Sequence, residues 1–139
     1  MLRSRVGRAA EKCTGTVLIL DDDDIVRESI AEVVRSYGGQ VFEARESAEA
    51  LRMLDTVARP CLVLLDLVMP SMNGVGFLDC LKAHPRASDF RVLVVSAHPL
   101  AHRARALPWV VGTLQKPFEV SVLEQWLDRV FNEQDGSIQ

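Results

Sequence analysis

Residues 17–24 read VLILDDDD, so four apolar side chains run directly into four carboxylates. The apolar half has the length and composition of a short buried strand, which places the acidic half where that strand ends and the chain turns. Two unit charges about 4 Å apart repel by about 4 kcal/mol at an effective dielectric constant of about 20. A divalent cation that prefers oxygen ligands, such as Mg²⁺, is the natural partner for such a cluster.

An alternative is that the acidic run caps a helix. An aspartate at a helix start accepts hydrogen bonds from free N–H groups and suits the helix dipole, and we expect one or two of the four to do so. One cap does not need four carboxylates, however, so the run favours a metal site over capping alone.

The composition is that of one globular domain, with 139 residues, 48% of them hydrophobic and 25% charged. The net charge of -3 argues against a basic surface for nucleic acid. No apolar run has the length of a membrane span. The three cysteines are isolated and lack metal-ligand spacing, so we expect reduced thiols in a cytoplasmic protein.

We expect the domain to cover residues 16–131, after a flexible arm at 1–15 and before a tail at 132–139. If this is the full gene product, we expect no room after the last helix for a DNA-binding helix-turn-helix, and output would depend on contact with another protein or on passing a phosphoryl group onward. If it is a piece of a longer protein, a DNA-binding or enzymatic output module could follow it.

Hydrophobic periodicity predicts five strands alternating with five helices. The strands are expected at 16–20, 40–44, 61–65, 91–96 and 109–115. The helices are expected near 25–37, 48–58, 75–83, 98–107 and 122–131, the fourth short or irregular because prolines bracket it. Ser47 is the expected cap of the second helix, and Gly38-Gly39 is expected to end the first.

This alternation indicates a doubly wound α/β fold, in which a five-stranded parallel sheet is covered by helices on both faces. Sites in such folds lie at the carboxyl ends of the strands. A polar residue follows an apolar run at four of these ends: Asp21-Asp22, Asp66, Ser96 and Lys116. Their joint placement predicts one polar pocket.

A carboxylate, an acidic pair, a hydroxyl and an ammonium in one pocket suit phosphoryl transfer. Asp66 could act as the nucleophile and form an aspartyl phosphate, while Lys116 and Ser96 contact the phosphoryl oxygens. Taken singly, each has an ordinary explanation: a turn or cap for Asp66, a local hydrogen bond for Ser96, and a solvated surface lysine for Lys116.

At these residues the chain resembles the receiver domain of two-component response regulators. The matching segments lie in order and at the family's spacing: 17–23 (VLILDDD), 64–70 (LLDLVMP), 73–74 (NG), 94–97 (VVSA) and 116–118 (KPF). The resemblance covers about 16–131 and implies a flavodoxin-like (CheY-like) fold with strand order 2-1-3-4-5.

The resemblance also implies roles for individual residues. Asp66 would accept a phosphoryl group from a sensor histidine kinase or phosphotransfer protein. Asp21 and Asp22 would hold Mg²⁺, with Asp22 the direct ligand, and Asp66 and the backbone carbonyl of Val68 would complete the protein ligands. Ser96 and Lys116 would contact the phosphoryl oxygens, and the bond after Lys116 is commonly cis in the family.

The sequence departs from the family pattern on the expected output face. The switch aromatic three residues before the lysine is Thr113, so no rotating ring can report a movement of Ser96. Trp109 stands where small residues are usual. Either it forms part of a surface that binds a partner, or it packs across a gap left by the short fourth helix. The residue two after Asp66 is Val68, where a polar residue could position water, and the residue two after Ser96 is His98. Because Val68 cannot orient an attacking water, we predict slow self-dephosphorylation.

Two other interpretations remain open. Residues 22–26 (DDDIV) also fit the motif of haloacid-dehalogenase-type phosphohydrolases, in which Asp22 would be the nucleophile. Alternatively, the chain could be a degenerate receiver that binds partners without phosphorylation. In the favoured interpretation it catalyses only its own phosphorylation and dephosphorylation, is a monomer or phosphorylation-dependent dimer, and contacts neither nucleic acid nor membrane.

Overall fold

The computed structural model describes residues 15–57, 61–66, 74–97 and 110–132. Five parallel strands form one sheet in the order β2-β1-β3-β4-β5, which confirms the predicted architecture and strand order. The strands are β1 (Thr16–Leu20), β2 (Gln40–Ala44), β3 (Cys61–Leu65), β4 (Phe90–Ser96) and β5 (Val110–Gln115). The predicted bounds of β1, β2 and β3 are confirmed, and β4 begins one residue earlier than predicted. Trp109, the predicted first residue of β5, lies outside the described residues.

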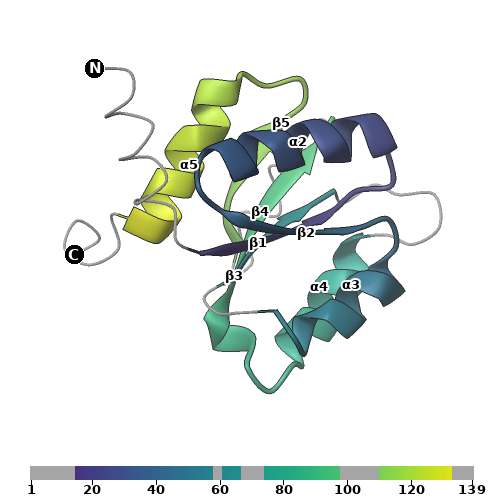
Figure 1. Ribbon diagram of the computed structural model, residues 1–139. Coiled ribbons are helices and arrows are strands. Elements are labelled where there is room, and N and C mark those ends of the chain that lie inside the picture. Colours follow the sequence, from purple (N-terminus) through teal and green to yellow (C-terminus); the bar gives the residue numbers. More distant parts are fainter. Residues whose placement is uncertain (1–14, 58–60, 67–73, 98–109, 133–139) are drawn as a thin grey trace.

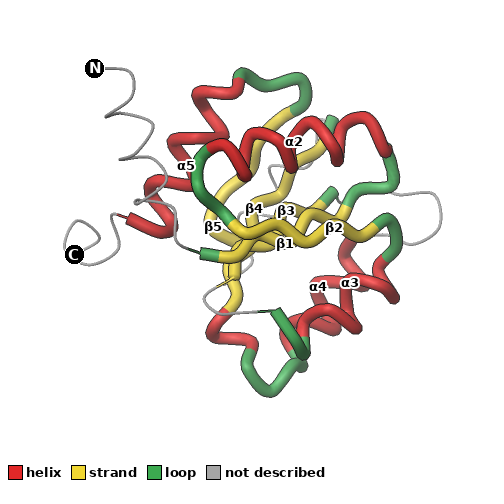
Figure 2. Tube along the Cα trace, in the orientation of Figure 1, coloured by secondary structure: helices red, strands yellow, loops and turns green. Residues whose placement is uncertain are grey.

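Helices cover both faces of the sheet (Figure 1). One face carries α2 (Asp24–Ser36) and α5 (Val120–Asn132), and the other carries α3 (Ser47–Leu54) and α4 (Gly74–Lys82). The tube view separates these two helical layers from the strands between them (Figure 2). A short 3-10 helix, η1 (Ala87–Asp89), precedes β4 and was not predicted. The helix predicted at 98–107 lies outside the described residues.

The core consists of two apolar layers separated by the sheet. Successive residues of β1 alternate between them: Val17 and Ile19 pack toward α2 and α5, while Leu18 and Leu20 pack toward α3 and α4. All five residues of β1 and of β3 are buried, as expected for central strands of a parallel sheet. No described helix has the length and apolar character needed to cross a membrane.

The described cysteines fit the prediction of reduced thiols. Cys61 and Cys80 are both free, and Cys61 is buried at the start of β3. Burial raises the pKa of the Cys61 thiol to about 12, so the side chain is a neutral part of the core at physiological pH.

Glycines end α2 as predicted. Gly38 has a φ of 97°, a left-handed conformation that glycine adopts without strain. The Gly38 N–H donates to the carbonyl of Arg35, and the Gly39 N–H donates to that of Val34. These two bonds form a Schellman motif, which satisfies carbonyls at the helix end and turns the chain into β2.

A β-bulge distorts the edge strand β5. Val110 pairs with Val92 and Gly112 with Leu93, so one additional residue is inserted between them in β5. A Cβ atom at Gly112 would lie 2.3 Å from Cη2 of Trp126 on α5. Only glycine therefore lets the indole lie against this strand.

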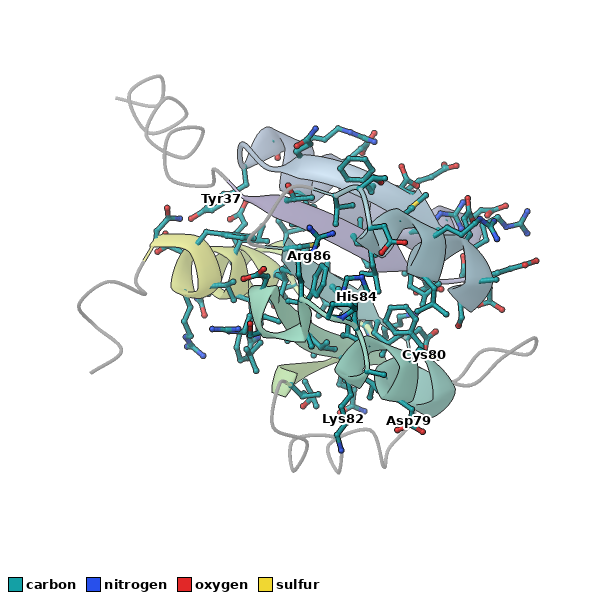
Figure 3. The ribbon with its side chains drawn as sticks, turned by 90° about the horizontal axis from the view of Figure 1, so that it is seen from below. Tyr37, Asp79, Cys80, Lys82, His84 and Arg86 are labelled. Atoms are coloured by element: carbon teal, nitrogen blue, oxygen red, sulfur yellow. The ribbon has the colours of Figure 1, made fainter. Side chains whose placement is uncertain are left out.

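Polar contacts to Asp55 join the C-terminal ends of α3 and α4 through His84 and Arg86, whose side chains are labelled in Figure 3. His84 Nε2 lies 2.9 Å from Oδ1 of Asp55, and His84 Nδ1 accepts the backbone N–H of Arg86 at 3.0 Å. The imidazole also meets the Phe90 ring edge-on, with 5.5 Å between ring centroids. Because Nδ1 is an acceptor, the proton of the neutral ring belongs on Nε2, where it is donated to Asp55.

The prediction that Ser47 caps α3 is wrong. The N-cap is Glu46, whose side chain makes no capping bond, and Ser47 lies one residue further on, inside the helix. The Ser47 side chain is fully buried, and its hydroxyl has no hydrogen-bond partner among the described residues. The sequence signal was misread because a serine at a helix start is usually the cap, whereas here the extended backbone of Glu46 takes that position.

Replacing Ser47 by Ala is expected to raise the free energy of unfolding by about 1 kcal/mol, because it removes a buried hydroxyl that lacks a partner. Urea unfolding of both proteins measures the change. The control is Ser36→Ala. The exposed Ser36 hydroxyl donates to the Val33 carbonyl at 3.0 Å, so its removal should not raise the free energy of unfolding. A loss of stability in Ser47→Ala would show that this hydroxyl has a partner after all.

Candidate functional site

The predicted polar residues lie together where the strands have their carboxyl ends. The Asp21 N–H donates to the Ala44 carbonyl and the Asp66 N–H to the Leu20 carbonyl, each at 3.1 Å. The Lys116 N–H donates to the Ser96 carbonyl at 3.0 Å. Each residue thus extends the hydrogen-bond ladder by one position, so its backbone is held by the sheet.

Three carboxylates meet at the carboxyl ends of the strands. Asp21, Asp22 and Asp66 each offer an oxygen atom, and these atoms all lie within 4.8 Å of one another. Asp21 is 2% exposed and Asp66 is 8% exposed, while Asp22 is half-buried. Oxygen donors at this spacing fit a hard cation such as Mg²⁺, which is held by a few carboxylates and retains several waters. They are the three side chains predicted to hold the metal.

Lys116 bridges two of these carboxylates. Its Nζ donates to Oδ2 of Asp21 at 2.7 Å and to Oδ2 of Asp66 at 3.3 Å. Burial acts to lower the pKa of Lys116, but the two carboxylates outweigh it and the pKa is raised. The ammonium is therefore fully charged at neutral pH. The Lys116–Pro117 peptide bond is cis, as the resemblance implied.

The four consecutive aspartates make different contacts. Asp21 and Asp22 belong to the carboxylate cluster, whereas Asp23 Oδ1 caps α2 by accepting the N–H groups of Ile25 and Val26. Asp24 pairs with Arg27 of the same helix, and this hydrogen bond lowers the pKa of the Asp24 carboxyl. Capping and metal binding were posed as alternatives, and different members of the run fit each of them.

The other predicted residues are placed in part. Ser96 is the last residue of β4 and is 1% exposed, opposite Gln115 of β5. Thr113 is half-buried within β5, opposite Val94, three residues before the lysine. Val68, His98 and Trp109 lie outside the described residues.

Sequence reasoning missed one residue that touches the site. Arg27 of α2 is buried, and its Nη1 donates to the backbone carbonyl of Asp21 at 2.9 Å. The i, i+3 spacing of Asp24 and Arg27 was a signal for the ion pair between them. Nothing in the sequence indicated the bond to the backbone.

Comparison with known proteins identifies the family. The family model of the response regulator receiver domain matches residues 17–128, which includes every strand from Val17 onward and each acidic residue of the site. This chain belongs to that family. Receiver domains are signalling modules of two-component systems, and membership argues against the phosphohydrolase interpretation in which Asp22 is the nucleophile.

Curated relatives show the receiver domain in proteins of very different length. Chemotaxis protein CheY of Pseudomonas aeruginosa is 31% identical over 123 residues, which cover 86% of this chain and 98% of that protein. Sensor kinase CckA of Brucella abortus is 32% identical over 88% of this chain but only 13% of the kinase. Transcriptional regulatory protein FixJ of Azorhizobium caulinodans is 36% identical over 74% of this chain and 48% of that protein.

Solved receiver structures have the same fold. Chemotaxis response regulator CheY4 of Vibrio cholerae superposes with a TM-score of 0.74 at 25% identity, covering 84% of this chain and 98% of that one. A CheY-like receiver protein of Methanospirillum hungatei gives a TM-score of 0.75 at 22% identity, covering 87% and 96% of the two chains. The second likeness is one of fold alone.

Replacing Lys116 by Met is expected to lower the free energy of unfolding of the metal-free receiver by about 2 kcal/mol, because two buried carboxylates lose their cation. Added Mg²⁺ is expected to raise the melting temperature of this variant more than that of the wild type, since no ammonium then competes for the same oxygens. Thermal unfolding followed by circular dichroism, with and without Mg²⁺, measures both effects.

The matched control is Arg52→Met, which alters an exposed basic residue of α3. Its melting temperature and its response to Mg²⁺ should equal those of the wild type. An identical Mg²⁺ response in Lys116→Met and wild type would mean that the ammonium and the cation do not share carboxylates.

Proposed function

We propose that this chain is a phosphoacceptor of a two-component phosphorelay. It takes a phosphoryl group from a sensor histidine kinase or a phosphotransfer protein onto Asp66, in a reaction that requires Mg²⁺. The observation that carries this proposal is the meeting of the Asp66 carboxylate with two further carboxylates and the Lys116 ammonium. Family membership supports it independently.

The arrangement suits attack by a carboxylate on phosphorus. An Asp66 oxygen forms the new O–P bond as the N–P bond of a phosphohistidine breaks, and the departing imidazole nitrogen keeps the electron pair. Asp21, Asp22 and Asp66 would hold Mg²⁺, with the Val68 carbonyl as a further ligand. When bound, the metal supplies positive charge to the transferring oxygens.

Lys116 supplies the second positive charge. Its ammonium lies 3.3 Å from Asp66, so it can contact a phosphoryl oxygen on that residue after a small movement. Ser96 ends the neighbouring strand, and we assign its hydroxyl a hydrogen bond to another phosphoryl oxygen. These two side chains would sense phosphorylation directly, because β4 and β5 end beside β3, the strand that Asp66 follows.

Output would depend on contact with another protein. Thr113 cannot turn an aromatic ring in response to Ser96, so the response must be transmitted differently, and we assign the partner surface to the region of Trp109. We place the protein in the cytoplasm with its kinase. Beyond its own phosphorylation and dephosphorylation we assign it no catalysis. Thr113 also favours the second candidate, a receiver that binds its partner without phosphorylation.

Incubation with acetyl phosphate and Mg²⁺ is expected to add the mass of one phosphoryl group to the intact wild-type protein. No addition is expected without Mg²⁺ or in Asp66→Asn, because the metal and the nucleophile are then missing. Asp79→Asn, which alters an exposed aspartate of α4, should be phosphorylated like the wild type. Intact-protein mass spectrometry measures all four samples.

Each other outcome has a distinct meaning. Labelling that survives Asp66→Asn and disappears in Asp22→Asn would make Asp22 the nucleophile. Failure of the folded wild type to accept phosphate from acetyl phosphate and from a phosphorylated histidine protein would leave the phosphorylation-independent binding module.

The phosphoryl group on Asp66 is expected to decay slowly, because Val68 has no polar group to orient an attacking water. Val68→Asn is expected to speed the decay severalfold, whereas Val68→Ile should leave it unchanged. The loss of phosphoryl mass with time after removal of the donor measures the rate. Equal rates in Val68→Asn and wild type would show that this position does not control hydrolysis.

A further inference from the structure

Arg27 is a buried cation beside the carboxylate cluster. It is 7% exposed, and among the described arginines and lysines it alone is classed as buried. Burying a charge is costly unless the charge is paired and hydrogen-bonded. Three acceptors meet this requirement: Oδ1 of Asp24 at 2.7 Å, Oε1 of Glu43 at 3.2 Å and the carbonyl oxygen of Asp21 at 2.9 Å.

The two ion pairs explain only part of this arrangement. Glu43 lies on β2, so its pair with Arg27 attaches α2 to this edge strand. Arg35, about two turns further along α2, makes a second bond to the same carboxylate at 3.2 Å. Two arginines of α2 therefore bond Glu43 and attach the helix to β2, but only Arg27 of these two also bonds the Asp21 carbonyl.

That carbonyl belongs to the peptide bond between Asp21 and Asp22. The peptide group is planar, so fixing its oxygen also fixes the direction in which the Asp22 backbone leaves the strand. The remaining polar groups of Asp21 are engaged as well. Its N–H donates to Ala44, Oδ1 accepts the Asp23 N–H at 2.9 Å, and Oδ2 accepts Lys116.

We infer that Arg27 is a positioning residue of the metal site, which holds the Asp21–Asp22 peptide so that both carboxylates face the cation. This inference rests on the proposed Mg²⁺-dependent function. Outer partners that orient metal ligands affect affinity strongly although they never touch the metal. Arg27 would act on the site only through the Asp21 carbonyl.

The sign of the effect separates positioning from simple electrostatics. A positive charge near a cation site weakens binding, so removing the Arg27 charge alone would tighten Mg²⁺ binding. Loss of the carbonyl bond has the opposite effect, because the two carboxylates are then less well placed. Weaker binding in a variant without this charge therefore indicates positioning.

The test is Mg²⁺ affinity, measured by isothermal titration calorimetry at constant ionic strength on variants shown to be folded by circular dichroism. Arg27→Met is expected to raise the Kd about tenfold, while Arg35→Met and Glu43→Gln stay within about twofold of wild type. Arg35→Met is the matched control, since it removes an arginine from the same helix and the same carboxylate. Glu43→Gln weakens the attachment of α2 but leaves the Asp21 bond.

A second measurement needs no metal. In a ¹H–¹⁵N spectrum of the metal-free protein, Arg27→Met should shift the Asp22 amide, which shares its peptide plane with the Asp21 carbonyl, and Arg35→Met should not. Arg27→Lys keeps the charge but replaces the guanidinium, which bonds three acceptors at once, by a compact ammonium, and its Kd should lie between those of wild type and Arg27→Met. If Arg27→Met does not fold, the same comparison is made with Arg27→Lys.

The outcomes keep the two proposals apart. Wild-type protein that binds no Mg²⁺ would overturn both the inference and the proposed function. Wild-type binding together with unchanged or tighter binding in the Arg27 variant would overturn the inference alone. A Kd that rises equally in Glu43→Gln and Arg27→Met would also overturn it, because attachment of the helix would then be the cause.

Discussion

Repulsion between carboxylates at the carboxyl ends of β1 and β3 is the constraint on which this structure depends. Two of them are almost fully buried, where charge is most costly without compensation. Two cations from distant parts of the chain offset it. Lys116 contacts the carboxylates themselves, and Arg27 donates to the backbone carbonyl of Asp21. The sheet supplies the rigidity, because each acidic residue continues a strand whose side chains are buried on both faces.

The same repulsion gives the site its chemistry. In the resting protein the Lys116 ammonium lies against this cluster. In the proposed reaction Mg²⁺ would bind the same oxygens before the phosphoryl group arrives, and the ammonium would then turn to a phosphoryl oxygen on Asp66. The cation that contacts the Asp66 carboxylate would thus change during the reaction.

The central strands could be predicted residue by residue because their continuous apolar runs are bounded by turn residues. The meeting of the site residues could also be predicted, since parallel strands end at a common edge. Other features depend on contacts between distant segments. Ser47 resembles a cap in sequence and is none, the bulge in β5 accompanies the packing of Trp126 on Gly112, and the bond from Arg27 to a backbone carbonyl requires the finished turn after β1.

The packing of Trp126 on Gly112 has a spectroscopic consequence. Indole emission shifts to longer wavelength when the ring becomes more exposed to water, and this ring lies where α5 meets the edge strand. The sequence contains two tryptophans, so in a Trp109→Phe background all emission comes from this one position. The wavelength of this emission would then report how closely α5 lies on the sheet, beside the strand in which Thr113 stands where the family usually has an aromatic residue.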